Sequence, residues 1–415
     1  MTPQIKQRIE QIRRGEVPEG YKRTKVGIVP EEWEEGFLGN YIQEYKELSN
    51  DIEKYPVYSS SRQGLIPQSQ YYDNREAVET NLGYKIVPNG YVTYRHMSDD
   101  DVFHFNVNNT GGEILVSSEY PVFSSTEKSS LGYIIPMLND TAHFRYFCRT
   151  QKMGGTRTRL YYKNLCTYKS VYPPLAEQEK IGEILQTQDK LIALKEKLIE
   201  EKKRQKKALM QQLLTGKKRL PGFSDEWRKI KLSAVLIEGN KVAVVDTSMY
   251  RKMTVKLAFK GLEFTKTDRE MADTRPFYVR KKNEIIIGKQ NYFNGSVALV
   301  TDEFDGCICS NAIMSFGVKN VNVKFILEYI SQVNFMKKRE MLANGTGQKE
   351  LSEKEFLNFE IKLPCVEEQN YIGNIASTCD SEILLLQKDL DQEKQKKKAL
   401  MQLLLTGIVR VEVNE

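Results

Sequence analysis

The residues of this 415-residue chain that could do chemistry are cations, amides and aromatic side chains, gathered in polar loops between short apolar runs. Arginine and lysine can donate to guanine O6 and N7, and asparagine and glutamine pair with adenine N6 and N7. Such loops suit base reading in the major groove of DNA, although a polar loop is most often only a solvated loop. The candidate DNA-binding residues are Arg62, Arg95, His96, Arg157, Arg159, Lys289, Gln290, Asn291, Gln348 and Lys349.

No sequence motif indicates a catalytic centre. Gly15 and Gly20 have the spacing of a phosphate-binding loop, but Tyr21 stands where a lysine is needed to reach the phosphates. The pair Pro173 and Pro174 lacks the amide or carboxylate with which an amino-methyltransferase holds its target amino group. His-Glu-x-x-His is also missing. We therefore expect no catalytic residues and no cofactor, while a short, degenerate nuclease carboxylate cluster stays open.

The composition excludes other classes of protein. The net charge of +7 is compatible with a polyanionic partner, but a mean charge decides little until its placement is known. The six cysteines and three histidines have no zinc-site spacing, so we expect no metal and interpret the thiols as reduced, in a cytoplasmic protein. Because the first fifteen residues are polar and amphipathic, we expect no secretion signal there. No apolar stretch approaches the roughly 20 residues of a membrane span, so no membrane partner is expected.

The elements that must position these loops are marked by an internal repeat. Residues 177–216 recur without a gap as residues 368–407, 191 positions further along. Both copies begin Glu-Gln-x-x-Ile-Gly and end Ala-Leu-Met-Gln-x-Leu-Leu-Thr-Gly, and the final glycine is typical of a helix end. A repeat that keeps its helical part while the intervening domains differ indicates two different readers held at one fixed spacing.

Each repeated segment carries a narrow apolar stripe at three-four spacing, which predicts a helix packed along another helix. At about 1.5 Å per residue, forty residues give a helix on the order of 60 Å long. Short connections at the ends favour an antiparallel pair, a coiled coil formed by the two copies. The expected coiled-coil and partner-contacting residues are Ile181, Ile184, Leu191, Leu198, Leu213, Leu214, Ile372, Ile375, Leu386, Leu390, Leu404 and Leu405.

Both stripes are interrupted at equivalent places by charged residues, 200–207 in the first copy and 391–398 in the second. Charge runs on helices usually mean only a solvated face. The alternative is a basic stretch that faces phosphates or an acidic partner subunit. Because the two charged runs occupy equivalent positions in the repeat, they favour a structural role for this part of the helices.

The two segments that precede the repeats begin and end with matching sequence patterns but differ in between. We call the matching start and end the frame of each domain. Each begins near a tryptophan, Trp33 or Trp227, and each ends with a Gly-Thr loop, a short polar helix signal and an extended stretch that leads into proline. Short β-type runs punctuated by Gly, Asn, Asp and Pro predict mainly β, loop-rich α+β domains. The expected boundaries are an N-terminal helical fragment at 1–20, the two domains at 21–172 and 219–362, and long helices at 173–218 and 363–415.

The paired segments, each preceded by a Gly-Thr loop, resemble the specificity subunits of type I restriction–modification enzymes. The resemblance extends over essentially the whole chain, from residue 173 to 216 and again from 363 to 407 around the domains. It implies an α+β fold with an internal pseudo-twofold repeat: two target-recognition domains separated by two long antiparallel helices that form a coiled coil. It also implies that the domains read the two halves of a bipartite, asymmetric DNA sequence.

The partners that the resemblance implies are double-stranded DNA, two adenine-methylating modification subunits and ATP-driven restriction subunits that cleave DNA. The subunit itself would do no chemistry, in agreement with the missing motifs. Two other readings remain: a self-contained DNA methyltransferase or nuclease, and an architectural coiled-coil adaptor. The first would bind S-adenosylmethionine or a divalent ion by itself. The second would have interchangeable end domains, whereas these domains differ and the helices agree.

Overall fold

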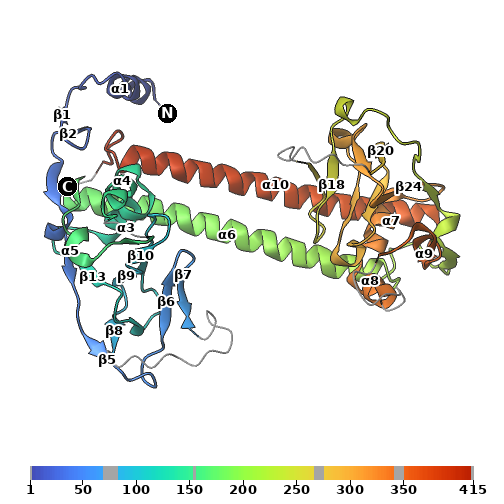
Figure 1. Cartoon of the computed structure of the whole chain (residues 1–415), viewed down its shortest axis with the longest axis horizontal. Helices are drawn as coiled ribbons and strands as arrows, with labels where there is room; N and C mark the ends of the chain where they lie inside the picture. Colours follow the sequence, from blue (N-terminus) through green and yellow to red (C-terminus); the bar gives the residue numbers. More distant parts are fainter. Residues whose placement is uncertain (1, 69–82, 153–155, 266–274, 341–349, 413–415) are drawn as a thin grey trace. The chain divides into compact units, whose positions relative to one another are not determined.

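The structure is a computed structural model that describes residues 2–68, 83–152, 156–265, 275–340 and 350–412 (Figure 1). The chain folds as two compact units. Unit 1 consists of Met1–Lys195 and Asp389–Glu415, and unit 2 of Glu196–Lys388. This division cuts both long helices, so each unit holds the start of one long helix and the end of the other.

The long helices are α6, Leu175–Leu213, and α10, Val366–Leu404, each 39 residues long (Figure 1). They confirm the helices that the repeat predicts. The glycines that close the repeats have positive φ angles, 68° at Gly216 and 70° at Gly407, which a side chain would make unfavourable. These two glycines therefore end the helical conformation.

Ion pairs between α6 and α10 show that the helices are antiparallel within each unit. In unit 1 Asp189 contacts Lys397 at 2.6 Å, and Lys195, further along α6, contacts the earlier residue Asp389. In unit 2 the order is the same, because Lys202 contacts Glu382 at 2.5 Å and Lys206 contacts Asp380 at 2.7 Å. The partner number falls as the α6 number rises, which confirms the antiparallel pairing.

Unit 1 contains a four-stranded sheet in the order β11-β9-β13-β4, a three-stranded sheet β12-β8-β5, and the two-stranded pairs β1-β2, β3-β15, β6-β7 and β10-β14, within its described residues. The helices other than α6 and α10 are α1 Pro3–Arg13, α3 Leu131–Asp140, α4 Ala142–Thr150 and α5 Tyr162–Leu165. The strands are β1 Tyr21–Arg23, β2 Ile28–Pro30, β3 Glu34–Phe37, β4 Ile42–Glu44, β5 Leu48–Ser49, β6 Tyr58–Ser61, β7 Gly64–Pro67, β8 Tyr84–Val87, β9 Val92–Tyr94, β10 Met97–Ser98, β11 Phe105–Val107, β12 Ile114–Ser117, β13 Val122–Ser125, β14 Thr158–Arg159 and β15 Lys169–Tyr172.

Unit 2 repeats the plan with fewer strands in its described part: a four-stranded sheet β17-β24-β21-β22 and the pairs β16-β25, β18-β19 and β20-β23. Its helices are α7 Val323–Ile330, α8 Val333–Glu340 and α9 Glu353–Leu357. Its strands are β16 Arg228–Lys231, β17 Leu236–Glu238, β18 Met253–Val255, β19 Leu262–Phe264, β20 Phe277–Val279, β21 Ile285–Gly288, β22 Val297–Leu299, β23 Ile308–Ser310, β24 Ile313–Val318 and β25 Glu360–Leu363. The predicted mainly β, α+β domains are confirmed.

The short helix and the extended stretch of the expected frames are present at the end of both domains, whereas Gly155, Gly345 and Thr346 of the Gly-Thr loops lie outside the described residues. The short helices α5 and α9 precede the strands β15 and β25, and each strand leads into a long helix. Each strand pairs with the one that follows the domain's tryptophan, β15 with β3 and β25 with β16. The frame therefore fastens the last strand of a domain to its first segment, next to the start of a long helix.

The Glu-Gln pair that opens each repeat is buried and holds the start of the long helix. Gln178 donates from Nε2 to the carbonyl of Pro173 at 2.9 Å, and Gln369 donates to the carbonyl of Pro364 at 3.0 Å. Their Oε1 atoms accept from the backbone N–H groups that begin α3 and α7. The glycine that follows in unit 1, Gly182, is needed because a Cβ there would lie 2.9 Å from the backbone of α3.

The buried glutamates of the same motif bind arginines that follow the opposite long helix. Glu177 accepts from Arg410 at 2.7 Å and 2.9 Å in unit 1. Glu368 accepts from Arg219 with both distances at 2.9 Å in unit 2. The two pairs are related by the 191-residue repeat. Bidentate arginine–carboxylate pairs are strong and geometrically specific, so each one ties the start of one helix to the segment after the other.

The ends of the long helices belong to the domain cores. Leu213 and Leu214 pack in the core of unit 2, and Leu404 and Leu405 pack in that of unit 1. The predicted N-terminal helix is confirmed as α1, and it is attached to the tail of the chain, because Arg8 donates to the carbonyl of Ile408 at 3.0 Å.

Candidate nucleic-acid interface

Three segments of unit 1 bring candidate cations to one edge of the domain. Arg62 lies at the tip of the β6–β7 hairpin, and Arg157 precedes β14, which pairs with β10. The turn after β10 joins them: Asp100 accepts from Arg62, and Asp99 accepts from Nε of Arg157 at 2.8 Å. Both arginine side chains are exposed. This edge combines residues that are far apart in the sequence.

The aspartate turn, residues Asp99, Asp100 and Asp101, was not among the predicted site residues. Its shape is fixed locally, because Ser98 donates from its hydroxyl to Asp100 at 2.9 Å and accepts from the N–H of Val102 at 3.1 Å. Asp101 has a φ of 62°, in the left-handed region that aspartate tolerates better than most residues, and accepts from Thr158. Three consecutive acidic residues beside Arg95 were the sequence signal that could have revealed it.

Arg95 and Arg159 are exposed on the same domain, and their side chains have no hydrogen bond or carboxylate partner among the residues that the structure describes. Both lie near His96, where their charges and, above all, burial lower its pKa. His96 is only 2% exposed and its ring stacks on Tyr161 at 5.3 Å. The expectation that His96 contacts DNA is therefore wrong for this structure, because its side chain lies inside the domain.

In unit 2 the candidate residues Lys289, Gln290 and Asn291 form the turn after β21. Gln290 and Asn291 are exposed, and Asn291 accepts from the side chain of Asn294 at 3.3 Å. The other two candidates of this unit, Gln348 and Lys349, lie outside the described residues. The turn therefore presents two exposed amides next to one lysine.

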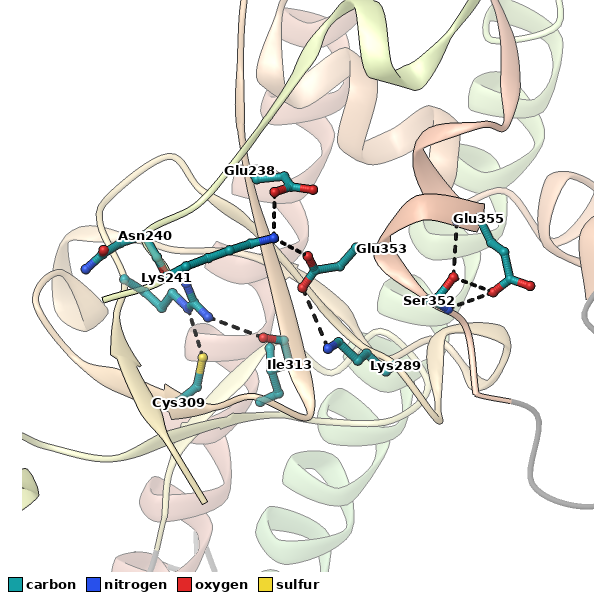
Figure 2. Close-up of polar contacts among 10 residues, drawn as sticks. Glu238, Asn240, Lys241, Lys289, Cys309, Ile313, Ser352, Glu353 and Glu355 are labelled. Atoms are coloured by element: carbon teal, nitrogen blue, oxygen red, sulfur yellow. Dashed lines mark hydrogen bonds and ion pairs between the residues drawn. The ribbon is translucent and has the colours of Figure 1, made fainter. Parts of the chain in front are cut away.

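Lys289 is not free, since Glu353 at the start of α9 holds it at 3.6 Å. Figure 2 shows Lys241 between Glu353 and Glu238, at 2.8 Å and 2.5 Å. The hydrogen bonds to Glu238 and Glu353 raise the pKa of Lys241 to about 12. Burial opposes ionisation of Glu353, but the two lysines outweigh it and lower its pKa. Lys241, Glu238 and Glu353 were missed because Glu353 lies 112 residues from Lys241 in the sequence, although Glu238 is only three residues from Lys241.

The segment that carries Lys241 is fixed by a buried arginine. Arg280, 3% exposed, donates to the carbonyls of Asn240 at 3.0 Å and Ile313 at 3.3 Å, and to Sγ of Cys309 at 3.1 Å. On the other side, a capping box of Ser352 and Glu355 begins α9 and so positions Glu353. The lysine–carboxylate network therefore lies between two fixed elements.

Equivalent backbone hydrogen bonds show that the loops of the two domains occupy the same place in the frame. The N–H of Leu160 donates to the carbonyl of His96 at 2.8 Å, and the N–H of Leu351 donates to that of Lys289 at 2.9 Å. Leu160 and Leu351 are 191 positions apart, as in the repeat. The residue whose carbonyl accepts this hydrogen bond is thus a buried histidine in unit 1 and a lysine paired with a glutamate in unit 2.

The apolar residues expected between the long helices differ in burial. Ile181, Leu213, Leu214, Ile372, Leu404 and Leu405 are buried, and Ile184, Leu191, Ile375, Leu386 and Leu390 are partly buried. Leu198 is 42% exposed, whereas Ile199 is 4% exposed. Placing Leu198 between the helices was therefore wrong: consecutive residues of a helix point about 100° apart, and Ile199 has the inward position.

The interrupted part of the stripe is filled by ion pairs between the helices. Lys206 contacts Asp380 at 2.7 Å and Glu328 at 2.8 Å, and Lys324 also contacts Asp380, at 2.6 Å. The repeat-related residues, Asp189 and Lys397, pair in unit 1. Several lysines of the charged runs are thus oriented towards the other helix, while Lys203, Arg204 and Lys207 stay exposed.

Within the described part of the chain, no group of three or more His, Cys, Asp or Glu residues could hold a metal ion. Among the helices in the same residues, none is both long and apolar enough to cross a membrane.

Comparison with known proteins gives one consistent match. The family described as "Type I restriction modification DNA specificity domain" matches residues 30–204 and 226–394. The chain is 24% identical over 435 residues to the putative type I restriction enzyme MjaX specificity subunit of Methanocaldococcus jannaschii, covering 95% of this chain and 97% of that one. The MjaVIII specificity subunit of the same organism is 23% identical, covering 95% and 96%.

Two solved structures share the fold. The type I restriction–modification S subunit of M. genitalium superposes with a TM-score of 0.56 at 12% identity, over 90% of this chain and 96% of that one. A chain from a study of complex assembly and conformational transition of the type I R-M system gives a TM-score of 0.51 at 14% identity, over 92% and 99%.

Proposed function

Because this chain belongs to the family of type I restriction–modification DNA specificity proteins, we propose that its two recognition domains, 21–172 and 219–362, each read one half of a bipartite, asymmetric DNA site. One observation carries the proposal. The frame position fixed by the equivalent leucine hydrogen bonds holds His96 against Tyr161 in one domain and Lys289 against Glu353 in the other. A shared frame that carries different side chains at the same position is what two different half-sites require.

Base reading falls to the exposed groups that can make bidentate contacts. In unit 1 these are Arg62, Arg95, Arg157 and Arg159, and in unit 2 they are Gln290 and Asn291. Arginine suits guanine, and the amides suit adenine. Lys289 has a supporting role, because its ammonium group is held by Glu353.

The test is selection of bound duplexes from a randomised library, using the full chain purified with its modification partners. Arg157→Ala should relax one base pair in one half-site, and Gln290→Ala one base pair in the other, each costing roughly 1–3 kcal/mol at a base-reading position. Lys169→Ala, which removes a cation paired with Glu35 on the frame strands, is the matched control and should leave both half-sites unchanged. Equal weakening on every sequence would reduce Arg157 or Gln290 to a phosphate-positioning role.

We also propose two modification subunits per chain, docked on repeated surfaces of the long helices. Leu194 and Leu385 are repeat-related, and they are 66% and 65% exposed. Two identical partners need two equivalent surfaces, which only the repeated residues supply. Leu194→Glu should remove one partner without unfolding the chain, and Leu194→Glu with Leu385→Glu should remove both. Native mass spectrometry of the unmutated complex with one modification subunit per chain would contradict this proposal.

The complex as a whole would methylate adenine at N6 and, with restriction subunits, cleave DNA with ATP, while this chain supplies recognition and no catalysis. It would work in the cytoplasm, where the DNA is. Isothermal titration of the isolated chain should give no heat with S-adenosylmethionine; binding would support the self-contained methyltransferase instead.

The paired helices are proposed to set the spacing between the half-sites. Four residues inserted between Glu200 and Lys207 add about 6 Å of helix. The preferred spacer should lengthen by about one or two base pairs while both half-sites persist. An unchanged spacer in a correctly folded variant would show that the helices connect the domains without setting the distance.

A further inference from the structure

The cations beside the proposed reading loops are held by carboxylates in both domains. In unit 1 the aspartate turn engages three groups from two other segments: Arg157 through Asp99, Arg62 through Asp100, and the Thr158 hydroxyl through Asp101. The pairing is long-range, since 58 residues separate Asp99 from Arg157 and 38 separate Arg62 from Asp100. Folding therefore places the acidic turn against these arginines.

In unit 2 a different element makes the same kind of contact. Glu353, at the start of α9, contacts Lys289 of the turn 289–291, which we call the reading turn. It also contacts Lys241, in the segment between β17 and β18. The side chain of Glu353 is 25% exposed and is therefore more buried than that of Lys241, which is 56% exposed. Two unrelated loops thus reach the same electrostatic arrangement.

DNA is a polyanion, so a carboxylate that holds a cation opposes the binding of that cation to the DNA phosphates. A free arginine or lysine gains affinity on any duplex by releasing counterions, whatever the base sequence. A paired one must first exchange its carboxylate for a phosphate. The pairs of Arg62 and Arg157 are exposed, and exposed pairs contribute only about 0.2–1 kcal/mol, so specific base contacts can replace them at little cost.

We propose that Asp99, Asp100 and Glu353 are specificity determinants that suppress sequence-independent DNA binding. Asp99 holds Arg157, Asp100 holds Arg62, and Glu353 holds Lys289 of the reading turn and Lys241. The inference rests on the proposed function, because it requires these loops to face DNA. Arg95 and Arg159, which have no carboxylate partner in the described part of the chain, can contact DNA without such an exchange. The correct site releases the held cations through base contacts, and other sequences do not.

The test measures affinity for two duplexes, one with the selected site and one with the same composition in scrambled order, over a series of salt concentrations. The protein is the full chain with its modification partners. Asp99→Asn with Asp100→Asn, and independently Glu353→Gln, should tighten binding to the scrambled duplex about threefold or more. The salt slope should steepen by about 0.9 for each cation that gains a phosphate. Binding to the selected site should change less, so the specificity ratio falls.

Glu35→Gln is the matched control, because it removes the same charge from a carboxylate paired with Lys169, and this pair joins the frame strands β3 and β15 and not the reading loops. It should leave the specificity ratio and the salt slope as they were. Unchanged or weaker binding of the Asp99, Asp100 and Glu353 variants to the scrambled duplex would overturn the inference. The double variant Arg62→Ala, Arg157→Ala distinguishes failure of this inference from failure of the proposed function. If this variant binds both duplexes normally, the proposed DNA-facing surface of unit 1 is itself wrong.

Discussion

The two units hold the start of their long helices with the same ion pair but with different support. In unit 1 Glu177 accepts from Arg410 and also from Nε1 of Trp33, at 3.1 Å. In unit 2 Glu368 accepts from Arg219, but the buried Nε1 of Trp227 has no hydrogen-bond partner among the described residues. The repeat has preserved the charged pair, whereas the third partner is specific to unit 1. Of the contacts made by this glutamate, the arginine pair therefore occurs in both units, whereas the tryptophan hydrogen bond occurs only in unit 1 among the described residues.

Removing the arginines should give the largest effect. Arg219→Ala leaves Glu368, 1% exposed, with a buried and uncompensated charge, and such losses cost about 3–5 kcal/mol. Arg410→Ala should cost less, because Trp33 still donates to Glu177. Thermal unfolding, with hydrogen exchange followed separately in β9 and β21, measures the loss in each unit. An equal or larger cost for Arg410→Ala would contradict the difference drawn between the units.

Replacing the tryptophans tests the third partner directly. Trp33→Phe should destabilise unit 1 by about 1.5–3 kcal/mol, the range for a hydrogen bond to a charged group. Trp227→Phe removes an unpaired buried N–H, and its effect should stay within about 0.5 kcal/mol or be stabilising. Urea unfolding of the two variants provides the comparison. Similar losses in both would mean that ring packing, and not the bond to Glu177, determines the stability.

The ion pairs between the helices should give the smallest effect. Asp380→Asn loses contacts with Lys206 and Lys324, whereas Asp189→Asn loses one with Lys397. Because both aspartates are more than a third exposed, the expected costs are below about 1 kcal/mol, with Asp380→Asn the larger. Equal Tm shifts for the two variants would show that the second lysine adds nothing.

The Asp380 contacts should also depend on pH. Burial opposes ionisation of Asp380, but the two lysines outweigh it, so its pKa is lowered on folding. The contribution to stability is therefore present above the ordinary aspartate pKa of about 4 and is lost as the pH falls below it. The Tm difference between the unmutated chain and Asp380→Asn should shrink in that acid range, and a constant difference would contradict the assignment.

The sequence predicted what depends on local periodicity and on the repeat. The long helices, their terminal glycines and the strands around Tyr94 and Ile287 follow from patterns that neighbouring residues define. The inward position of Ile199 was missed because the apolar pattern followed leucines, whereas the inner face passes through Lys195 and Lys202, which pair with acids of the other helix.

The sequence identified candidate site residues by their type, but it did not predict which residues surround them in space. Arginine in a polar loop identifies a possible DNA contact, and Arg62 and Arg157 are indeed exposed. Their aspartate partners lie dozens of residues away, and no local pattern encodes such a pairing. His96 was misplaced for the same reason: a polar residue beside Arg95 gives no sign that Tyr161 covers it.

The most direct test of two independent readers in one frame is exchange of a single domain. Residues 21–172 are replaced by the corresponding domain of a relative that recognises a different sequence, and the frame from residue 173 onward is kept. Sequencing of methylated adenines in cells that carry this chain with its modification partners then gives both half-sites. The account predicts that one half-site changes to that of the relative while the other is retained. A change in both half-sites would contradict it.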